Sequence, residues 1–264
     1  MHTEPEPITV PRLRAMKQEG RPIACLTAYD ASFARVLDEA GIDLVLVGDS
    51  LGMVVQGRET TLAVTVDDMV YHTRCVARGL RRALLVADLP FASYAQPAQA
   101  LDNAARLMRA GARVVKLEAS ANQAEIVRHL GAQGIPVCAH LGLRPQSVHK
   151  LGGYRRQGTG EADAAQMLED AALLARCGAD LLLLECVPPR LAAEIRANVE
   201  VPVIGIGAGP DCDGQILVLY DLLGVSLGPV PPFARNFMNA APDIPGAVSA
   251  YVAAVRGRRF PERG

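Results

Sequence analysis

The chain lacks the features that mark membrane-spanning and nucleic-acid-binding proteins. No apolar run in its 264 residues approaches the roughly 18 residues that would cross a bilayer. Its 27 basic and 28 acidic residues nearly cancel, and the basic ones form only short clusters such as Arg81-Arg82 and Arg155-Arg156. Such clusters are typical of a solvated surface rather than of a face that binds nucleic acid. We therefore expect no membrane span and no nucleic-acid partner.

The spacing of the cysteines excludes sites built on a CxxC motif and zinc sites. No CxxC spacing occurs among the six cysteines, and no grouping with histidine resembles a zinc site. Cys25, Cys138 and Cys186 lie within or at the ends of apolar runs, where reduced thiols pack as small apolar side chains. The first seven residues are polar and acidic, unlike a signal peptide. These features predict a cytoplasmic protein with reduced cysteines.

Segments with strand and helix patterns alternate from about Ile23 onwards. The predicted strands are short and apolar on both faces, which is typical of a parallel sheet covered by helices. The triplets Glu39-Ala-Gly41, Arg109-Ala-Gly111 and Arg176-Cys-Gly178 each mark a helix end, a glycine turn and the start of a strand, so they indicate repeated βα units. The predicted strands are 23–28, 42–48, 83–88, 113–118, 136–140, 180–186 and 201–206, with a weaker eighth near 224–228.

About eight βα units in one α/β chain favour a (β/α)8 TIM-type barrel over a doubly wound sheet. A doubly wound sheet would need a glycine-rich phosphate loop after its first strand, where this chain reads Thr27-Ala-Tyr-Asp30. We expect residues 1–264 to form a single barrel domain with a short N-terminal extension and a C-terminal helical tail from about Pro245. The clearest predicted helices are 67–78, with Asp67 as its cap, 97–110 and 161–177.

Three neighbouring predicted strands end on acidic residues. Asp49, Asp88 and Glu118 come at the ends of strands two, three and four. Adjacent parallel strands lie about 4.8 Å apart, so three carboxylates at one rim can reach a common point. Oxygen-only ligands suit a hard cation such as Mg²⁺. The pattern favours a metal site, and the alternative is that one or more of these residues caps the following helix.

Lys116 and His140 belong to the same predicted rim. Lys116 precedes Glu118 by two residues, so both side chains point to one face of the strand. Inside a barrel the lysine would hold a substrate carboxylate, stabilise an enolate, or form a structural ion pair with Glu118 or Asp88. His140 ends strand five, where a core position and a catalytic role are equally open.

Glu185 and Ser50 are two further candidates. Glu185 ends strand six, roughly opposite the other carboxylates, and burial in an apolar run raises the pKa of such a group toward that of a general base. A helix cap or an ion pair is the alternative role for it. Ser50 lies in no GxSxG motif, so we do not expect a nucleophile. Its hydroxyl or backbone N–H would instead hold a substrate carboxylate.

Longer motifs, in order between about residues 8 and 255, are more specific than any single residue. They are Thr27-Ala-Tyr-Asp30, Val47-Gly-Asp-Ser-Leu-Gly-Met53, Thr65-Val66, Tyr71-His-Thr73, Ala87-Asp-Leu-Pro-Phe91, Val115-Lys-Leu-Glu118, His140-Leu-Gly-Leu143, Pro145-Gln-Ser147, Gly152-Gly-Tyr154, Leu184-Glu-Cys-Val-Pro188 and Ile204-Gly-Ile-Gly-Ala-Gly209. Together they resemble the ketopantoate hydroxymethyltransferase family, and generic barrels do not share them.

The resemblance implies a fold, a reaction and an assembly. The fold would be a (β/α)8 barrel of the phosphoenolpyruvate/pyruvate superfamily. The reaction would transfer a hydroxymethyl group from methylenetetrahydrofolate to α-ketoisovalerate (3-methyl-2-oxobutanoate) with Mg²⁺, giving ketopantoate for pantothenate and coenzyme A synthesis. The assembly would be a large homo-oligomer, typically a decamer.

The resemblance also implies roles for individual residues of this chain. The family's metal positions are matched by Asp49, Asp88 and Glu118. Its ketoacid-binding positions are matched by Asp49, Ser50, Asp88 and Lys116. Glu185 matches its proton acceptor, and His140 is a pocket residue without a settled role.

Two other functions remain open from the sequence. One is another Mg²⁺-dependent ketoacid-enolate enzyme of the same superfamily, such as a carbon–phosphorus mutase or a lyase of the isocitrate type. Those enzymes commonly carry a Lys-Cys-Gly-His-type segment, and this chain has none. The other is a non-catalytic barrel that binds a ketoacid or a partner, but a pure binder has no need of Glu185.

Overall fold

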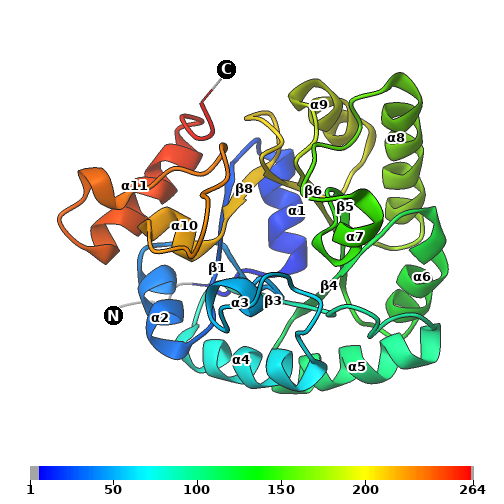
Figure 1. Cartoon of the computed structure of the whole chain (residues 1–264), viewed down its shortest axis with the longest axis horizontal. Helices are drawn as coiled ribbons and strands as arrows, with labels where there is room; N and C mark the ends of the chain where they lie inside the picture. The colour runs from blue at the N-terminus through cyan, green and yellow to red at the C-terminus, as the bar shows by residue number, and fades with distance from the viewer. Residues whose placement is uncertain (1–5, 263–264) are drawn as a thin grey trace.

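Eight parallel strands close into a barrel in the computed structural model, which describes residues 6–262. Each strand pairs with the next along the chain, and the last pairs with the first (Figure 1). The predicted (β/α)8 barrel is thereby confirmed. The strands are β1 (Ile23–Thr27), β2 (Leu44–Val47), β3 (Leu84–Asp88), β4 (Val114–Glu118), β5 (Val137–Gly142), β6 (Leu181–Glu185), β7 (Val203–Ile206) and β8 (Gly214–Leu217).

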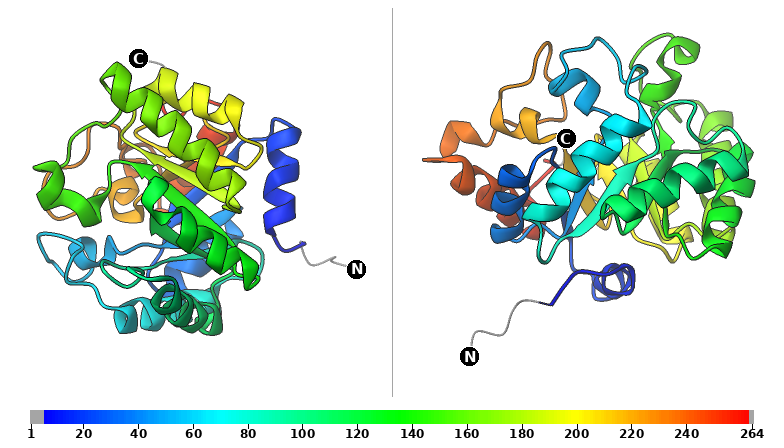
Figure 2. Two further views of the ribbon diagram at one scale, coloured as in Figure 1. Left: turned by 90° about the vertical axis from the view of Figure 1, so that its right-hand side faces the viewer. Right: turned by 90° about the horizontal axis from the view of Figure 1, so that it is seen from below.

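Most of the longer helices surround the strands, whereas the first lies apart from the others (Figures 1 and 2). The helices are α1 (Val10–Gln18), α2 (Ala31–Glu39), α3 (Leu51–Val54), α4 (Val66–Gly79), α5 (Pro97–Ala110), α6 (Ala124–Ala132), α7 (Val148–Leu151), α8 (Glu161–Arg176), α9 (Pro189–Asn198), α10 (Leu219–Leu223) and α11 (Ile244–Arg256). Short 3₁₀ turns are η1 (Ala121–Gln123), η2 (Pro145–Ser147) and η3 (Met238–Ala240). Figure 1 shows α2, α4, α5, α6, α8 and α9 around the barrel, and Figure 2 shows α1 apart from this ring.

Two apolar layers hold the barrel together. Alternate strand residues face opposite sides, so Leu85 packs with the outer helices while Leu84 fills the barrel interior. Met16 of α1 packs against the interior layer, and Lys17 pairs with Asp213, which directly precedes β8. Helix α1 therefore covers the end where the strands begin. A substrate must approach the opposite rim, where the strands finish.

The eighth strand does not lie where the sequence pattern placed it. The prediction near 224–228 is wrong, because β8 spans Gly214–Leu217 and the later segment leaves Val225 and Leu227 exposed beyond α10. A Cβ at Gly214 would lie 2.6 Å from the carbonyl oxygen of Ile23 in β1, so the close approach of the two strands requires glycine. The strand thus begins with glycine and a polar residue, Gln215, and only Ile216 and Leu217 carry the apolar signal by which a strand is recognised.

The helix boundaries follow the predicted caps and terminating glycines, with one correction. Helix α5 ends where Gly111 adopts φ +117°, as expected for a glycine that terminates a helix. The cap predicted at Asp67 is wrong, because Thr65 caps α4 and exchanges hydrogen bonds with Asp68 in a capping box. Asp67 lies in the first turn instead, where it pairs with Arg106 of α5.

The predicted C-terminal helix is confirmed as α11, which starts one residue before Pro245. Its Tyr251 is buried, and the hydroxyl lies 2.8 Å from the carbonyl oxygens of both Cys25 and Gln215, which ties the helix to β1 and β8. Residues 1–5 of the predicted N-terminal extension lie outside the described residues. Over residues 6–262 the cysteines are free, and no helix is long and apolar enough to cross a membrane.

Candidate active site

A group of ionisable side chains occupies the interior of the barrel at the rim where the strands finish. Residues two apart in a strand share a face. The ionisable groups that lie within the strands are therefore on the same strand face as the apolar side chains that fill the barrel interior. All of them are buried except Glu185, whose side chain is 18% exposed. The group consists of Asp49 after β2, Asp88 in β3, Lys116 and Glu118 in β4, His140 in β5 and Glu185 in β6.

Asp88 and Lys116 form a buried ion pair. They are neighbours in the paired strands β3 and β4, and the Lys116 Nζ lies 2.6 Å from Asp88 Oδ1. The other oxygen of Asp88 accepts a hydrogen bond of 2.9 Å from the backbone N–H of Asp49. Burial alone would lower the pKa of Lys116, but the carboxylates of Asp88 and Asp49 outweigh it and raise that pKa above its usual value. The lysine therefore keeps its positive charge at the rim.

Asp49 and Glu118 are each held by Gln146, which lies in η2 after β5. The Gln146 side-chain amide donates to Asp49 Oδ2 at 2.8 Å, and its backbone N–H donates to Glu118 Oε1 at 2.9 Å. Burial, followed by the nearby Asp88, raises the pKa of Asp49 to about 7. Burial also raises the pKa of Glu118 to about 8. The hydrogen bonds and positive charges around these two carboxylates therefore do not fully offset the cost of burying them in their charged form.

The rim fits a hard cation in donor chemistry, although it is not a closed ligand cage. Within residues 6–262, no three His, Cys, Asp or Glu side chains lie close enough together to form a ready metal cluster. The second oxygen of Glu118, Oε2, is however buried without a hydrogen-bond partner. A buried, unpartnered carboxylate oxygen is costly in isolation, and a cation bound at this rim would satisfy it.

Glu185 faces His140 across the rim. The two atoms His140 Nε2 and Glu185 Oε2 are 3.3 Å apart, which is within ion-pair range. Neither ring nitrogen has a well-directed hydrogen-bond partner, and burial, with Lys116 nearby, lowers the pKa of His140 well below its usual value. The imidazole is therefore neutral and does not neutralise Glu185. Burial raises the pKa of Glu185 to about 7, which Lys116 only partly offsets.

The chain turns sharply just after Glu185. Cys186 adopts φ +49°, a left-handed conformation that is uncommon for a residue other than glycine. Two backbone hydrogen bonds hold it there. Its N–H donates to the Ile206 carbonyl, and its carbonyl oxygen accepts from the backbone N–H of Gln157. Gly142 in β5 lies so close that a Cβ there would be 2.2 Å from the Glu185 carbonyl oxygen. The backbone around Glu185 is thus tightly determined by its neighbours.

Ser50 lies at the start of α3, directly after Asp49. Its Oγ is 2.9 Å from the hydroxyl of Tyr29, so the two hydroxyls share a hydrogen bond. Burial raises the pKa of Tyr29 well above its usual value, which keeps that phenol protonated. The serine is therefore a neutral hydrogen-bonding group beside Asp49, and it has no basic partner in this contact.

A model of the ketopantoate hydroxymethyltransferase family matches residues 7–263. The chain belongs to this family. A 3-methyl-2-oxobutanoate hydroxymethyltransferase from Halorhodospira halophila is 61% identical over 98% of this chain and 94% of its own length. The enzyme of that name from Nitrosococcus oceani is 58% identical over 96% and 97%. The family resemblance of the motifs is confirmed, and the chain is a hydroxymethyltransferase.

Solved structures with the same fold belong to the phosphoenolpyruvate mutase/isocitrate lyase superfamily. A phosphoenolpyruvate phosphomutase from Streptomyces platensis has a TM-score of 0.62 at 15% identity, covering 81% of this chain and 82% of that one. A 2,3-dimethylmalate lyase has a TM-score of 0.58 at 18% identity, with 81% and 82% covered. These likenesses confirm the fold, and they are far weaker in sequence than the likeness to hydroxymethyltransferases.

Two residues of the hydroxymethyltransferase rim carried no predicted role. Gln146 is buried and contacts both Asp49 and Glu118, and Tyr94, from the loop after β3, donates to the Gln146 Oε1 at 2.5 Å. Gln146 lies in the motif Pro145-Gln-Ser147, which was the only signal that could have pointed to it. A pocket of about 230 Å³ adjoins these residues and Glu118, and it opens between the loops after β3, β4 and β5.

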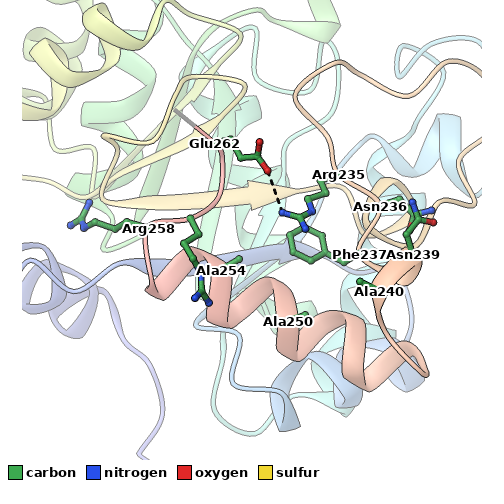
Figure 3. Close-up of a pocket in the computed structure, with 10 residues that line it drawn as sticks. Arg235, Asn236, Phe237, Asn239, Ala240, Ala250, Ala254, Arg258 and Glu262 are labelled. Atoms are coloured by element: carbon green, nitrogen blue, oxygen red, sulfur yellow. Dashed lines mark ion pairs between the residues drawn. The ribbon is translucent and has the colours of Figure 1, made fainter. Parts of the chain in front are cut away.

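A larger pocket, of about 830 Å³, lies away from the rim between η3 and α11 (Figure 3). It contains none of the rim carboxylates. Its wall includes the ion pair of Arg235 and Glu262, 3.5 Å apart and largely exposed, and Arg258, whose guanidinium donates to the Gly20 carbonyl. Size alone therefore does not identify the active site, which we place at the rim because the buried ionisable groups gather there.

Substituting Glu185 is expected to stabilise the metal-free protein in a pH-dependent manner. The pKa of Glu185 is raised from its ordinary 4.5 to about 7, so its charge opposes folding increasingly as pH rises through this range. Glu185→Gln removes that cost, which amounts to about 3 kcal/mol at pH 8 and to under about 1 kcal/mol at pH 5. Denaturant unfolding at both pH values measures the gain. An equal change at the two pH values would contradict the raised pKa.

Proposed function

We propose that the chain transfers a hydroxymethyl group from methylenetetrahydrofolate to α-ketoisovalerate with Mg²⁺, giving ketopantoate. One observation carries the proposal: the charged Lys116–Asp88 pair shares a buried rim with Glu185, a carboxylate whose pKa lies near 7. That combination of a fixed cation and a poised base suits the formation of an enolate. The 61% identity to a 3-methyl-2-oxobutanoate hydroxymethyltransferase supports the choice of ketoacid and of donor.

Asp49, Asp88 and Glu118 would hold the cation. Their oxygen donors suit Mg²⁺, and the unpartnered Oε2 of Glu118 supports a cation at this rim. When bound, Mg²⁺ would polarise the ketone of the substrate and so acidify the adjacent C3–H. The neighbouring residues would then orient the substrate: Ser50 offers its hydroxyl to the substrate carboxylate, and Lys116 offers its charge to the ketone oxygen.

Glu185 would act as the general base. At neutral pH a carboxyl with a pKa of about 7 is partly ionised, and it takes up a proton from carbon more readily than an ordinary glutamate. Lys116 stabilises the negative charge that develops on the enolate oxygen. Neutral His140 lies beside Glu185 without competing for the proton.

The carbon transfer then balances without a further oxidant or reductant. The enolate carbon C3 would form a bond to the methylene carbon of the folate as one of its two carbon–nitrogen bonds breaks. Water would then supply the hydroxyl oxygen as the second carbon–nitrogen bond breaks. The two folate nitrogens would gain two protons, one equivalent to that removed from C3 and one from the water, so tetrahydrofolate leaves. The chain's own groups contribute the base, the enolate-stabilising cation of Lys116 and the hydrogen bond of Ser50.

We also propose that the protein works in the cytoplasm and assembles as a homo-oligomer, a decamer by the family resemblance. The family resemblance supports the assembly, and so do the exposed apolar side chains Val225, Leu227 and Val230 beyond α10. Sedimentation of the purified protein measures the subunit number.

A turnover assay tests the proposed function against its rivals. The purified protein is incubated with α-ketoisovalerate, methylenetetrahydrofolate and Mg²⁺, and ketopantoate is measured by mass spectrometry. We expect ketopantoate only when all three are present. Cleavage of the ketoacid, or activity on phosphonopyruvate, would support a lyase or mutase, and binding without turnover would support a non-catalytic barrel.

A further inference from the structure

Gln146 ties together segments that follow or end three other strands. Its side-chain Nε2 donates to Asp49 Oδ2 at 2.8 Å, after β2, and to the Leu89 carbonyl at 3.1 Å, after β3. Its backbone N–H donates to Glu118 Oε1 at 2.9 Å, at the end of β4. The residue is 6% exposed. A single buried glutamine from the loop after β5 therefore contacts two of the three predicted metal ligands.

The orientation of the Gln146 amide follows from its partners. Both hydrogens of Nε2 face acceptors, namely the Asp49 carboxylate and the Leu89 carbonyl, while Oε1 accepts from the Tyr94 hydroxyl. Turning the amide over would set its oxygen against the carboxylate and the carbonyl. The two acceptors thus fix which end of the amide meets Asp49, and the Tyr94 hydroxyl holds the other end in place.

The hydrogen bonds from Gln146 to Asp49 and to Glu118 each engage one oxygen of the carboxylate and leave its other oxygen free of Gln146. Gln146 holds Oδ2 of Asp49 and Oε1 of Glu118, and Oε2 of Glu118 is buried without a hydrogen-bond partner. A carboxylate pinned through one oxygen presents the second in a fixed direction. Two carboxylates pinned by the same residue are also fixed relative to each other.

We propose that Gln146 is a positioning residue for the divalent cation, and that Tyr94 acts through it. Gln146 orients Asp49 and Glu118 so that one oxygen of each is presented to the cation. The inference rests on the proposed function, because it takes these two carboxylates as cation ligands. It adds a determinant of cation affinity to the three predicted ligands.

A purely structural role for Gln146 would have different consequences. A glutamine that merely anchors η2 would, when replaced, lower stability and reduce kcat at every Mg²⁺ concentration. A positioning residue raises the dissociation constant of the cation, and saturating Mg²⁺ then restores most of kcat. The dependence on cation concentration therefore separates the two roles.

The test measures cation binding directly, with Mn²⁺ followed by electron paramagnetic resonance and Mg²⁺ by calorimetry. Gln146→Leu is expected to weaken binding about 10- to 100-fold, as removal of an outer hydrogen bond to a metal ligand typically does. Tyr94→Phe keeps the ring and removes only the hydroxyl, so we expect a smaller weakening. Gln157→Leu is the matched control, since this glutamine lies in the same loop and donates to the Arg155 carbonyl.

The double variant decides whether Tyr94 acts through Gln146. Once Gln146 is leucine, adding Tyr94→Phe should weaken cation binding no further. Additive weakening would overturn the role of Tyr94. Unchanged Mn²⁺ binding in a folded Gln146→Leu protein would overturn the inference, and Tyr94→Phe decides it in the same way if the leucine variant does not fold. A wild-type protein that binds neither cation would instead refute the proposed function.

Discussion

Glu185→Gln abolishes exchange of the C3 proton of α-ketoisovalerate into deuterated water, while the ketoacid still binds. The amide keeps the shape of the carboxyl but cannot accept the proton, so we expect a loss of about 100- to 10,000-fold in the exchange rate. Lys116, Asp49 and Asp88 are unchanged, so ketoacid affinity should remain near that of the wild type. Proton nuclear magnetic resonance of the C3 position measures the exchange.

Glu194→Gln on α9 is the control for this substitution, because Glu194 is an exposed glutamate outside the rim. It should exchange the C3 proton at the wild-type rate. Exchange that persists unimpaired in Glu185→Gln would remove Glu185 from the role of base. The neighbouring His140 would then be the next residue to substitute, since its Nε2 lies 3.3 Å from Glu185.

Asp49→Ala and Asp88→Ala lose Mg²⁺-dependent binding of the ketoacid. Each substitution removes one predicted ligand of the cation, and the ketoacid loses the charge that anchors it. Asp88→Ala also leaves the buried charge of Lys116 without its partner, which typically costs about 3–5 kcal/mol of stability. Asp88→Asn, which retains a hydrogen-bonding oxygen near Lys116, therefore serves as a second variant.

Calorimetry with and without Mg²⁺ separates the effect on the site from an effect on folding. The wild type should bind α-ketoisovalerate tightly only with Mg²⁺, and the Asp49 and Asp88 variants should bind it weakly in both conditions. Asp67→Ala in the exposed first turn of α4 is the control and should behave as the wild type does. Mg²⁺-dependent binding that survives in a folded Asp49→Ala protein would exclude Asp49 as a ligand.

The parts of the fold that strand periodicity determines could be predicted from the sequence. Lys116 and Glu118 share a strand face because side chains alternate along a strand, and Asp88 ends the neighbouring strand. Since the two strands are parallel, all three side chains are expected at one rim. The sequence left open whether Lys116 pairs with Asp88 or with Glu118. The structure places it on Asp88, its neighbour in register, with the two charged atoms 2.6 Å apart.

The parts that depend on loops or on close contacts could not be predicted. Gln146 reaches Asp49 because η2 turns back over the rim, and no periodic pattern encodes that turn. β8 escaped detection because it begins with Gly214, which its contact with Ile23 requires, and with polar Gln215, so only half of the strand is apolar. The roles of Asp49, Asp88, Glu118, Lys116 and Glu185 stay predictions, since placement at a rim does not by itself assign a role.

The most direct test of the central claim is exchange of the C3 proton by the wild-type protein without any folate. In the proposed mechanism, enolate formation at the rim requires the ketoacid, the cation and Glu185, and it precedes the encounter with the one-carbon donor. We therefore predict exchange into deuterated water with α-ketoisovalerate and Mg²⁺ alone, and its loss when the cation is removed by a chelator. Exchange that is absent until folate is added, or that continues undiminished after chelation, would contradict the account.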